Sequence, residues 1–131
     1  MTSSNNGEFD FWNDHSLEFL EMAMKRDHQE TVLKCHGRGS ASRECGDRVT
    51  FYLNVEGGCL SAISYDLSGC LFSHACANTL IQLARGKGPA EARQIKAQEI
   101  IDYLKTLPQR EYHCAHHVLK AFFLALDDLD S

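Results

Sequence analysis

Apolar and polar residues alternate along residues 47–55. One face of this segment carries four apolar side chains: Val49, Phe51, Leu53 and Val55. Alternation with a period of two is typical of a strand with one buried face. The Glu-Gly-Gly sequence at 56–58 is typical of a tight hairpin turn, and a second apolar segment follows at 59–69. The pattern therefore predicts two adjacent antiparallel strands.

After Gly69 the apolar residues recur at every third or fourth position, as on one face of a helix. Gly86 is typical of a helix end, Pro89 is typical of a first helical turn, and a helix should stop before Pro108. An amphipathic helix is also predicted near the N-terminus, capped by Asp14 or Ser16. The predicted helices cover residues 14–26, 70–85, 89–95, 97–106 and 114–129.

The remaining segments lack a clear period. We interpret residues 1–9 as a flexible tail, residues 30–36 as a short edge strand, and the glycine-rich residues 36–46 as a mobile loop. A small antiparallel sheet followed by helices predicts an α+β fold, with the helices packed on one face of the sheet. We see no internal repeat or linker, so the 131 residues are expected to form a single domain.

Composition excludes several functional classes. The formal net charge is −5 and no long basic cluster occurs, so we do not expect a nucleic-acid partner. No apolar run approaches the roughly 20 residues that span a bilayer, and the N-terminus lacks the basic start and apolar core of a secretory signal. We therefore expect a cytoplasmic protein without a membrane partner, whose thiols stay reduced.

The chain has six cysteines, none of which forms a C-x-x-C pair. Two of them fall inside predicted elements, Cys59 in a strand and Cys76 in the apolar stripe of a helix, and we interpret both as buried small hydrophobes. Three fall at element boundaries: Cys45, Cys70 and Cys114. We interpret Cys35, the sixth, as incidental, although an auxiliary role stays open.

The boundary cysteines are candidate metal ligands. Cys70 and Cys114 are predicted at helix N-termini, where free N–H groups and the macrodipole favour a thiolate. Asp47 follows Cys45 with only Gly46 between them, so both side chains could face one point. Three thiolates and one harder carboxylate would hold a soft metal that must later be released. Scattered structural thiols are the alternative that spacing alone leaves open.

Four motifs in this order resemble the U-type iron–sulfur cluster assembly scaffolds, the IscU/NifU N-terminal family. They are ECGDRV, LSGC, ARGKGPAEARQI and LPQREYHCAHHVLKAF, and the resemblance extends over residues 44–126. It implies an IscU/SufE-like fold and a non-enzymatic scaffold that builds an iron–sulfur cluster, most often [2Fe–2S], and hands it on. The implied cluster site consists of Cys45, Asp47, Cys70 and Cys114, with His113 beside it. Zinc could occupy the same ligands.

The resemblance also implies partners. A cysteine desulfurase would deliver sulfur as a persulfide, with Cys114 as the acceptor, and apo iron–sulfur proteins would receive the cluster from a monomer or homodimer. The Leu-Pro-Pro-Val-Lys segment that a chaperone reads in some members is here LPQRE, so we do not expect that partner. His116 and His117 replace apolar residues; we interpret His117 as a surface histidine, with a ligand role as the alternative.

Two other functions stay open. The first is a zinc-dependent sulfur-transfer protein that partners a cysteine desulfurase. Such relatives carry an insertion between the second and third cysteines and a lysine before the last one, whereas this chain has no insertion and has His113. The second is a diverged member with a structural or regulatory zinc. The sequence therefore favours the scaffold.

Overall fold

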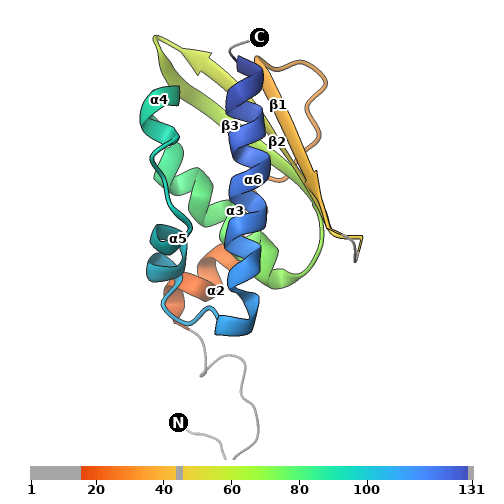
Figure 1. Ribbon diagram of the computed structural model, residues 1–131, viewed down its shortest axis with the longest axis vertical. Helices are drawn as coiled ribbons and strands as arrows, with labels where there is room; N and C mark the ends of the chain where they lie inside the picture. The colour runs from red at the N-terminus through yellow and green to blue at the C-terminus, as the bar shows by residue number, and fades with distance from the viewer. Residues whose placement is uncertain (1–15, 44–45, 130–131) are drawn as a thin grey trace, which may run out of the picture.

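The computed structural model describes residues 16–43 and 46–129 (Figure 1). The elements follow one another as α2 (Leu17–Met24), β1 (Gly37–Ser42), β2 (Arg48–Glu56), β3 (Cys59–Ser68), α3 (Leu71–Ala84), α4 (Pro89–Ala92), α5 (Ala97–Leu104), the 3₁₀ turn η1 (Gln109–Glu111) and α6 (Tyr112–Leu129). The α+β class is therefore confirmed. In these two ranges no helix is both long and apolar enough to cross a membrane.

The three strands form an antiparallel sheet in the order β1-β2-β3. The predicted hairpin is confirmed, because Glu56 pairs with Cys59 around a turn in which Gly57 and Gly58 both have positive φ. Such angles suit glycine, which has no Cβ to clash. Beyond the far edge of β3, the chain at His28 and Glu30 bonds the backbone of Tyr65.

The edge strand predicted at 30–36 is wrong. The strand is β1, which lies within the glycine-rich segment that the sequence indicated as a mobile loop. Gly37 and Gly39 face α6, and a Cβ on Gly39 would lie 2.5 Å from the carbonyl oxygen of Ala121 and would collide with the backbone of Ala125. These glycines let the helix backbone rest directly on the strand, which is a known use of glycine in strands.

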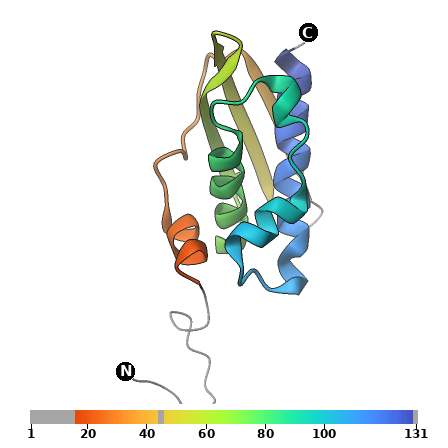
Figure 2. The same ribbon diagram turned by 90° about the vertical axis from the view of Figure 1, so that its left-hand side faces the viewer.

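The helices cover one face of the sheet, as predicted (Figures 1 and 2). α6 lies along β1 and β2, and α3 packs beside α6 and against β3. The largest fully buried side chains include Phe51, Tyr65 and Phe122, with the ring of Phe122 edge-on to Phe51. Phe19 brings α2 into the same core.

The helix boundaries differ slightly from the prediction. Ser16 caps α2, since its Oγ accepts the Phe19 N–H at 3.1 Å, whereas Asp14 and the 1–9 tail lie outside the described residues. The last helix begins at Tyr112, two residues earlier than expected, and η1 extends it backward to Gln109. This extension brings Glu111 into the first turns of a helix that carries Cys114.

Candidate functional site

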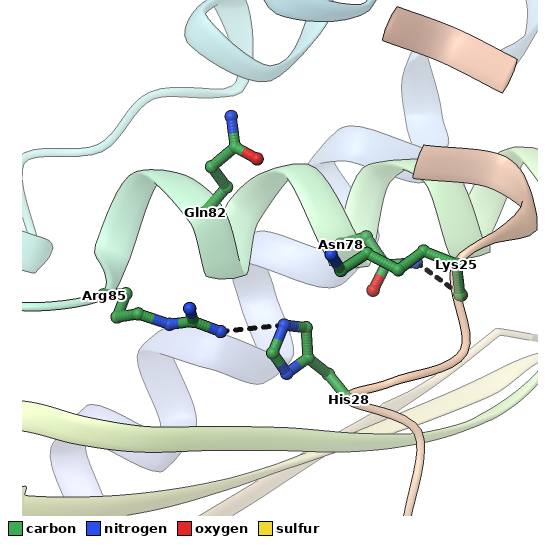
Figure 3. Close-up of a pocket in the computed structure, with 5 residues that line it drawn as sticks. All are labelled: Lys25, His28, Asn78, Gln82 and Arg85. Carbon is green, nitrogen blue, oxygen red and sulfur yellow. Dashed lines mark hydrogen bonds between the residues drawn. The ribbon is translucent and has the colours of Figure 1, made fainter. Parts of the chain in front are cut away.

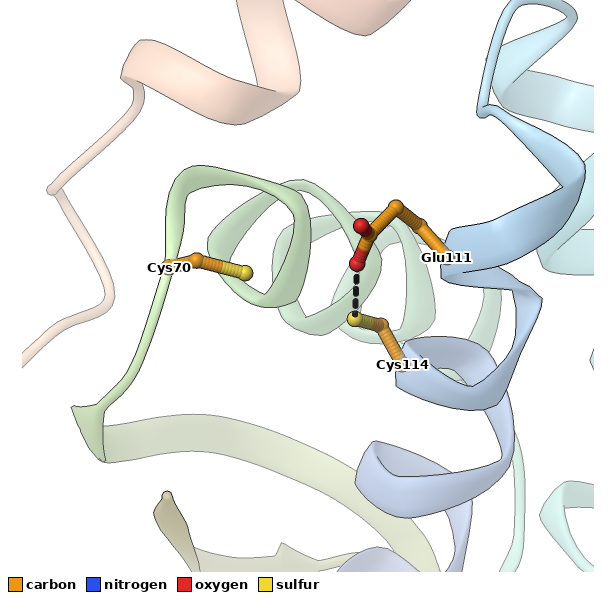
Figure 4. Close-up of side chains that lie close together, drawn as sticks. All are labelled: Cys70, Glu111 and Cys114. Carbon is orange, nitrogen blue, oxygen red and sulfur yellow. Dashed lines mark hydrogen bonds between the residues drawn. The ribbon is translucent and has the colours of Figure 1, made fainter. Parts of the chain in front are cut away.

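The starts of α3 and α6 meet at one end of the helical layer. Cys70 is the N-cap residue of α3, and Cys114 lies in the first turn of α6. Glu111 comes from η1, and its carboxylate points toward both sulfurs (Figure 4). The ligand atoms of these three residues all lie within 4.8 Å of one another, and in the described part of the chain they form the one such group of potential metal ligands.

Burial differs sharply between the two sulfurs. Cys70 is exposed, whereas Cys114 has 0% of its surface accessible. The Cys114 thiol donates to Oε1 of Glu111 at 3.7 Å and accepts from the hydroxyl of Ser73 at 3.5 Å. Ser73 is itself buried and lies 3.7 Å from the sulfur of Cys70. One hydroxyl thus bridges the two thiols.

The surroundings of Cys114 favour the thiol. Burial raises the pKa of Cys114 to about 12; the negative groups at Cys70 and Glu111 act in the same direction, while the Ser73 hydrogen bond opposes them. The thiolate that we expected at this helix start is therefore not favoured by the protein alone, because burial has a larger effect on the thiol than the Ser73 hydrogen bond. A bound cation would reverse this balance, since metal binding displaces the proton.

The other predicted ligands lie on the connection between β1 and β2. The carboxyl carbon of Asp47 is 3.6 Å from the point where a Gly69 Cβ would stand, immediately before Cys70. Its carboxylate pairs with Arg43 at 3.5 Å, and Gly46 between them has φ of +100°. Cys45 lies outside the described residues. The four-residue ligand set therefore stays a prediction, with Asp47 next to the group but not within it.

Three histidines follow or flank Cys114. His113 is exposed, and its Nε2 lies 3.8 Å from Oε1 of Glu111. His116 is exposed, whereas His117 is buried and its Nε2 is 3.1 Å from the carbonyl oxygen of Ala41. The expectation of a surface position for His117 is therefore wrong: burial lowers its pKa, so the neutral ring can link α6 to β1 by donating to this carbonyl.

Of the remaining cysteines, Cys76 lies close enough to this group that Cys114, Cys70 and Glu111 add to the main effect of burial in raising its pKa. Cys76 is fully buried, as predicted, whereas Cys59 at the start of β3 is half-buried. The thiol of Cys35 bonds the carbonyl of Gly37 at 3.3 Å. This is the end of β1 that pairs with Leu53, opposite the end that adjoins Arg48 and the start of α3. An auxiliary role for Cys35 at the cysteine pair therefore has no geometric support.

Sequence reasoning missed Glu111 and Ser73. Both stand three residues from a predicted ligand, Glu111 before Cys114 and Ser73 after Cys70. Residues three apart share one face of a helix, so this spacing was the available signal. Glu111 was overlooked because the last helix was predicted to begin at Cys114, which left the carboxylate in a loop.

A separate small pocket lies between α2, α3 and the chain after α2 (Figure 3). Arg85 contacts Nε2 of His28 at 2.8 Å, and burial together with Arg85 lowers the pKa of His28, so that this nitrogen can accept the bond. The amide of Asn78 donates to the carbonyl oxygens of Met22 and Lys25. These bonds join α2 to α3, and the pocket contains none of the predicted ligands.

Comparison with known proteins finds a family profile that matches the chain, relatives of similar sequence, and solved structures with a similar fold. The profile of the NifU-like N terminal domain matches residues 25–130. Two Archaeoglobus fulgidus proteins, named iron–sulfur cluster assembly scaffold proteins IscU 1 and IscU 2, are each 29% identical over 84 residues. That stretch covers 64% of this chain and 55% of each relative, so the chain matches about half of their length.

Two solved structures share the fold. The SUF-system protein FiSufU of Fervidobacterium islandicum AW-1 superposes with a TM-score of 0.71 at 18% identity, covering 89% of this chain and 99% of that one. The N-terminal part of a NifU-like protein from Brucella abortus gives 0.69 at 13% identity, covering 88% and 93%. At these identities the likeness concerns the fold alone.

Proposed function

Because this chain belongs to the NifU-like N-terminal domain family, we propose that it is a scaffold on which an iron–sulfur cluster is assembled and then passed to acceptor proteins. The resemblance seen in the four motifs is confirmed by the match to residues 25–130. The observation that carries the proposal is the meeting of Cys70 and Cys114 at two helix starts, with the Asp47 carboxylate beside Gly69. The names of the Archaeoglobus relatives support it.

The cluster, which is the cargo here, would be held by Cys45, Asp47, Cys70 and Cys114, with His113 as an alternative ligand. The donor chemistry fits, because thiolates are the usual ligands of iron–sulfur clusters. A carboxylate is a harder donor than a thiolate and would bind the iron less firmly. Such a set suits a [2Fe–2S] cluster that must be released, and the exposed Cys70 would leave one side open to an acceptor.

Sulfur would come from a cysteine desulfurase. A scaffold thiolate attacks the outer sulfur of the desulfurase persulfide, a new S–S bond forms, and the desulfurase leaves as its own thiolate. Reduction of that sulfur to sulfide takes two electrons from an external protein donor. We propose Cys114 as the acceptor, and its complete burial means that the partner must uncover the first turn of α6.

Three further attributes remain predictions: a non-enzymatic role, a cytoplasmic location, and a monomeric or homodimeric state. The zinc-dependent sulfur-transfer function and the structural zinc are the alternatives, and the names of the Archaeoglobus relatives support neither. Zinc would still compete for the same thiolates in a purified sample. Metal content therefore has to be controlled in any test of the scaffold.

Anaerobic reconstitution with ferrous iron and sulfide tests the proposal, with absorbance and Mössbauer spectra as the readout. We expect Cys70→Ala, Cys114→Ala and Cys45→Ala to lose the cluster. Cys35→Ala is the matched control, because its sulfur lies at the opposite end of β1 and bonds only Gly37 among the described residues. A wild-type protein that holds no cluster, or a Cys35→Ala variant that loses it, would contradict the proposal.

A further inference from the structure

Glu111 is a carboxylate that is largely withdrawn from water and has only long contacts to charged groups of the protein. Its side chain is only 21% exposed. In the described chain its polar neighbours are all distant: Nε of Arg110 at 3.8 Å, Nε2 of His113 at 3.8 Å and the Cys114 sulfur at 3.7 Å. Charge-assisted hydrogen bonds from nitrogen to carboxylates are about 1 Å shorter than the two contacts to nitrogen, and the third contact is a hydrogen bond from a weak thiol donor. The Glu111 carboxylate is therefore positioned to bind a cation, because its contacts within the protein are too long to take the place of one.

The spacing of the three ligand atoms matches that of a small tetrahedral ion. With bonds of about 2.3 Å to sulfur and about 2.1 Å to oxygen, a tetrahedral ion needs about 3.6 Å between a sulfur and an oxygen. The Cys114 sulfur and Oε1 of Glu111 are 3.7 Å apart. Two sulfurs need about 3.8 Å, and those of Cys70 and Cys114 lie within 4.8 Å, so a shift of at most about 1 Å suffices.

The groups around this site are consistent with a cation. The hydroxyl of Ser73 can donate to either thiolate. Residues that surround a metal site commonly form such hydrogen bonds to its ligands. Cys70 at the surface gives an ion access from solvent, whereas Cys114 is fully buried and Glu111 is partly buried. A set of two thiolates and one carboxylate is of intermediate softness, which suits Fe²⁺, Co²⁺ or Zn²⁺ better than Mg²⁺ or Ca²⁺.

We propose that Glu111 is a metal ligand, which together with Cys70 and Cys114 binds one divalent transition-metal ion at the start of α6. This rests on the proposed function only in that ferrous iron is the ion that a cluster scaffold receives. The three donors leave one tetrahedral position free, as in exchangeable sites. Glu111 then acts as the oxygen ligand through which iron is first held, before the Asp47 carboxylate or sulfide completes the coordination.

Anaerobic titration with Co²⁺ tests this inference, because thiolate-to-cobalt charge transfer and the ligand-field bands report both affinity and coordination. Loss of a group that only supports a metal ligand typically costs about 10- to 100-fold in affinity, so Glu111→Gln, which removes a ligand itself, should weaken Co²⁺ binding by at least about tenfold. It should also change the ligand-field bands of the saturated complex. The matched control is Glu91→Gln on the distant helix α4, which should bind as the wild type does (Figure 1).

The outcomes separate ligation from simpler roles. A Glu111→Gln variant with wild-type affinity and bands would overturn the inference. So would weaker binding with unchanged bands at saturation, because a carboxylate that acts only through its charge alters affinity and not coordination. Thermal unfolding of Glu111→Gln without metal shows whether its fold is intact, and if it is not, Glu111→Ala and Glu111→Asp are measured in its place, with the same two readouts deciding.

The inference and the scaffold proposal fail separately. If Glu111→Gln binds Co²⁺ normally while the wild type still assembles a cluster from iron and sulfide, only the role of Glu111 is refuted. If Glu111→Gln loses Co²⁺ while the wild type never retains a cluster, the metal ligand stands and the scaffold function is refuted.

Discussion

Gly39 in β1 offers the sharpest test of how this fold is held together. A methyl group at this position would lie 2.5 Å from the carbonyl oxygen of Ala121 and 2.6 Å from the carbonyl carbon of Leu124, and would collide with the backbone nitrogen of Ala125. Real Cβ contacts of this kind are about 3.4 Å or longer, so α6 and β1 must separate by about 1 Å. All three obstacles are backbone atoms, which no side-chain rotation can move.

The cost follows from this displacement. Overpacking a core typically destabilises a protein by about 1–3 kcal/mol, and the upper end applies because the α6–β1 contact cannot relax locally. We therefore expect Gly39→Ala to lower the free energy of unfolding by about 3 kcal/mol. Gly69→Ala is the matched control, since the same methyl group there meets its nearest neighbours at 3.6 Å and should change stability by less than about 1 kcal/mol.

Urea denaturation followed by circular dichroism measures both variants against the wild type. The slope of the transition must stay the same for the comparison to report native-state packing. A Gly39→Ala variant within about 0.5 kcal/mol of the wild type would refute the direct contact between the backbones of α6 and β1.

Two further predictions concern titration and thiol reactivity. Burial, helped by Arg26, lowers the pKa of His74 from 6.5 to about 4. Its neutral ring is buried beside the hydroxyl of Tyr65, so stability should be constant above about pH 6.5 and fall by about 3 kcal/mol towards pH 4, as the unfolded chain takes up the proton first. Denaturation midpoints across this range should show the fall, and His74→Gln should reduce it while leaving the part that His28 and His117 contribute; an unchanged slope in that variant would contradict this origin. For the thiols, iodoacetamide labelling at pH 8 should modify Cys70 at least about 100-fold faster than Cys114, because a thiol of pKa about 12 is ionised in only about one molecule in 10⁴ and Cys114 is also fully buried. Mass spectrometry of the labelled peptides gives the rates, and equal rates would refute the arrangement of the two sulfurs.

The elements that sequence analysis predicted well are those with a local signal. The β2–β3 hairpin has both alternation and a Gly-Gly turn, and α3 has a continuous apolar period that ends at a glycine with positive φ. β1 has neither, since its buried positions are Gly37, Gly39 and Ala41. Glycine is depleted in strands, and here its position is determined by a helix more than 80 residues later in the chain.

The part of the site that could be predicted from the sequence consists of the ligands that lie at helix starts. The cysteine pair was found because Cys70 follows a glycine and Cys114 precedes an apolar stripe. The deep burial of Cys114 was not foreseen, because it depends on how closely α6 packs against α3 and the sheet. The partnership with Glu111 depends on a 3₁₀ turn with a weak sequence signal, and a last helix predicted to begin at Cys114 leaves Glu111 outside it.

The packing of the second half of α6 against β1 also determines the position of its first turn. Its second half rests on the glycines of β1 through Ala121 and Ala125, and His117 bonds the carbonyl of Ala41. These contacts leave the helix little freedom to slide or tilt, since backbone atoms and a buried hydrogen bond both resist it. Cys114 lies about 10 Å back along the same helix from Ala121, so its distance from Cys70 is set mainly by packing against the sheet. The predicted ligands on the β1–β2 connection have to reach a pair of sulfurs whose positions the core has already determined.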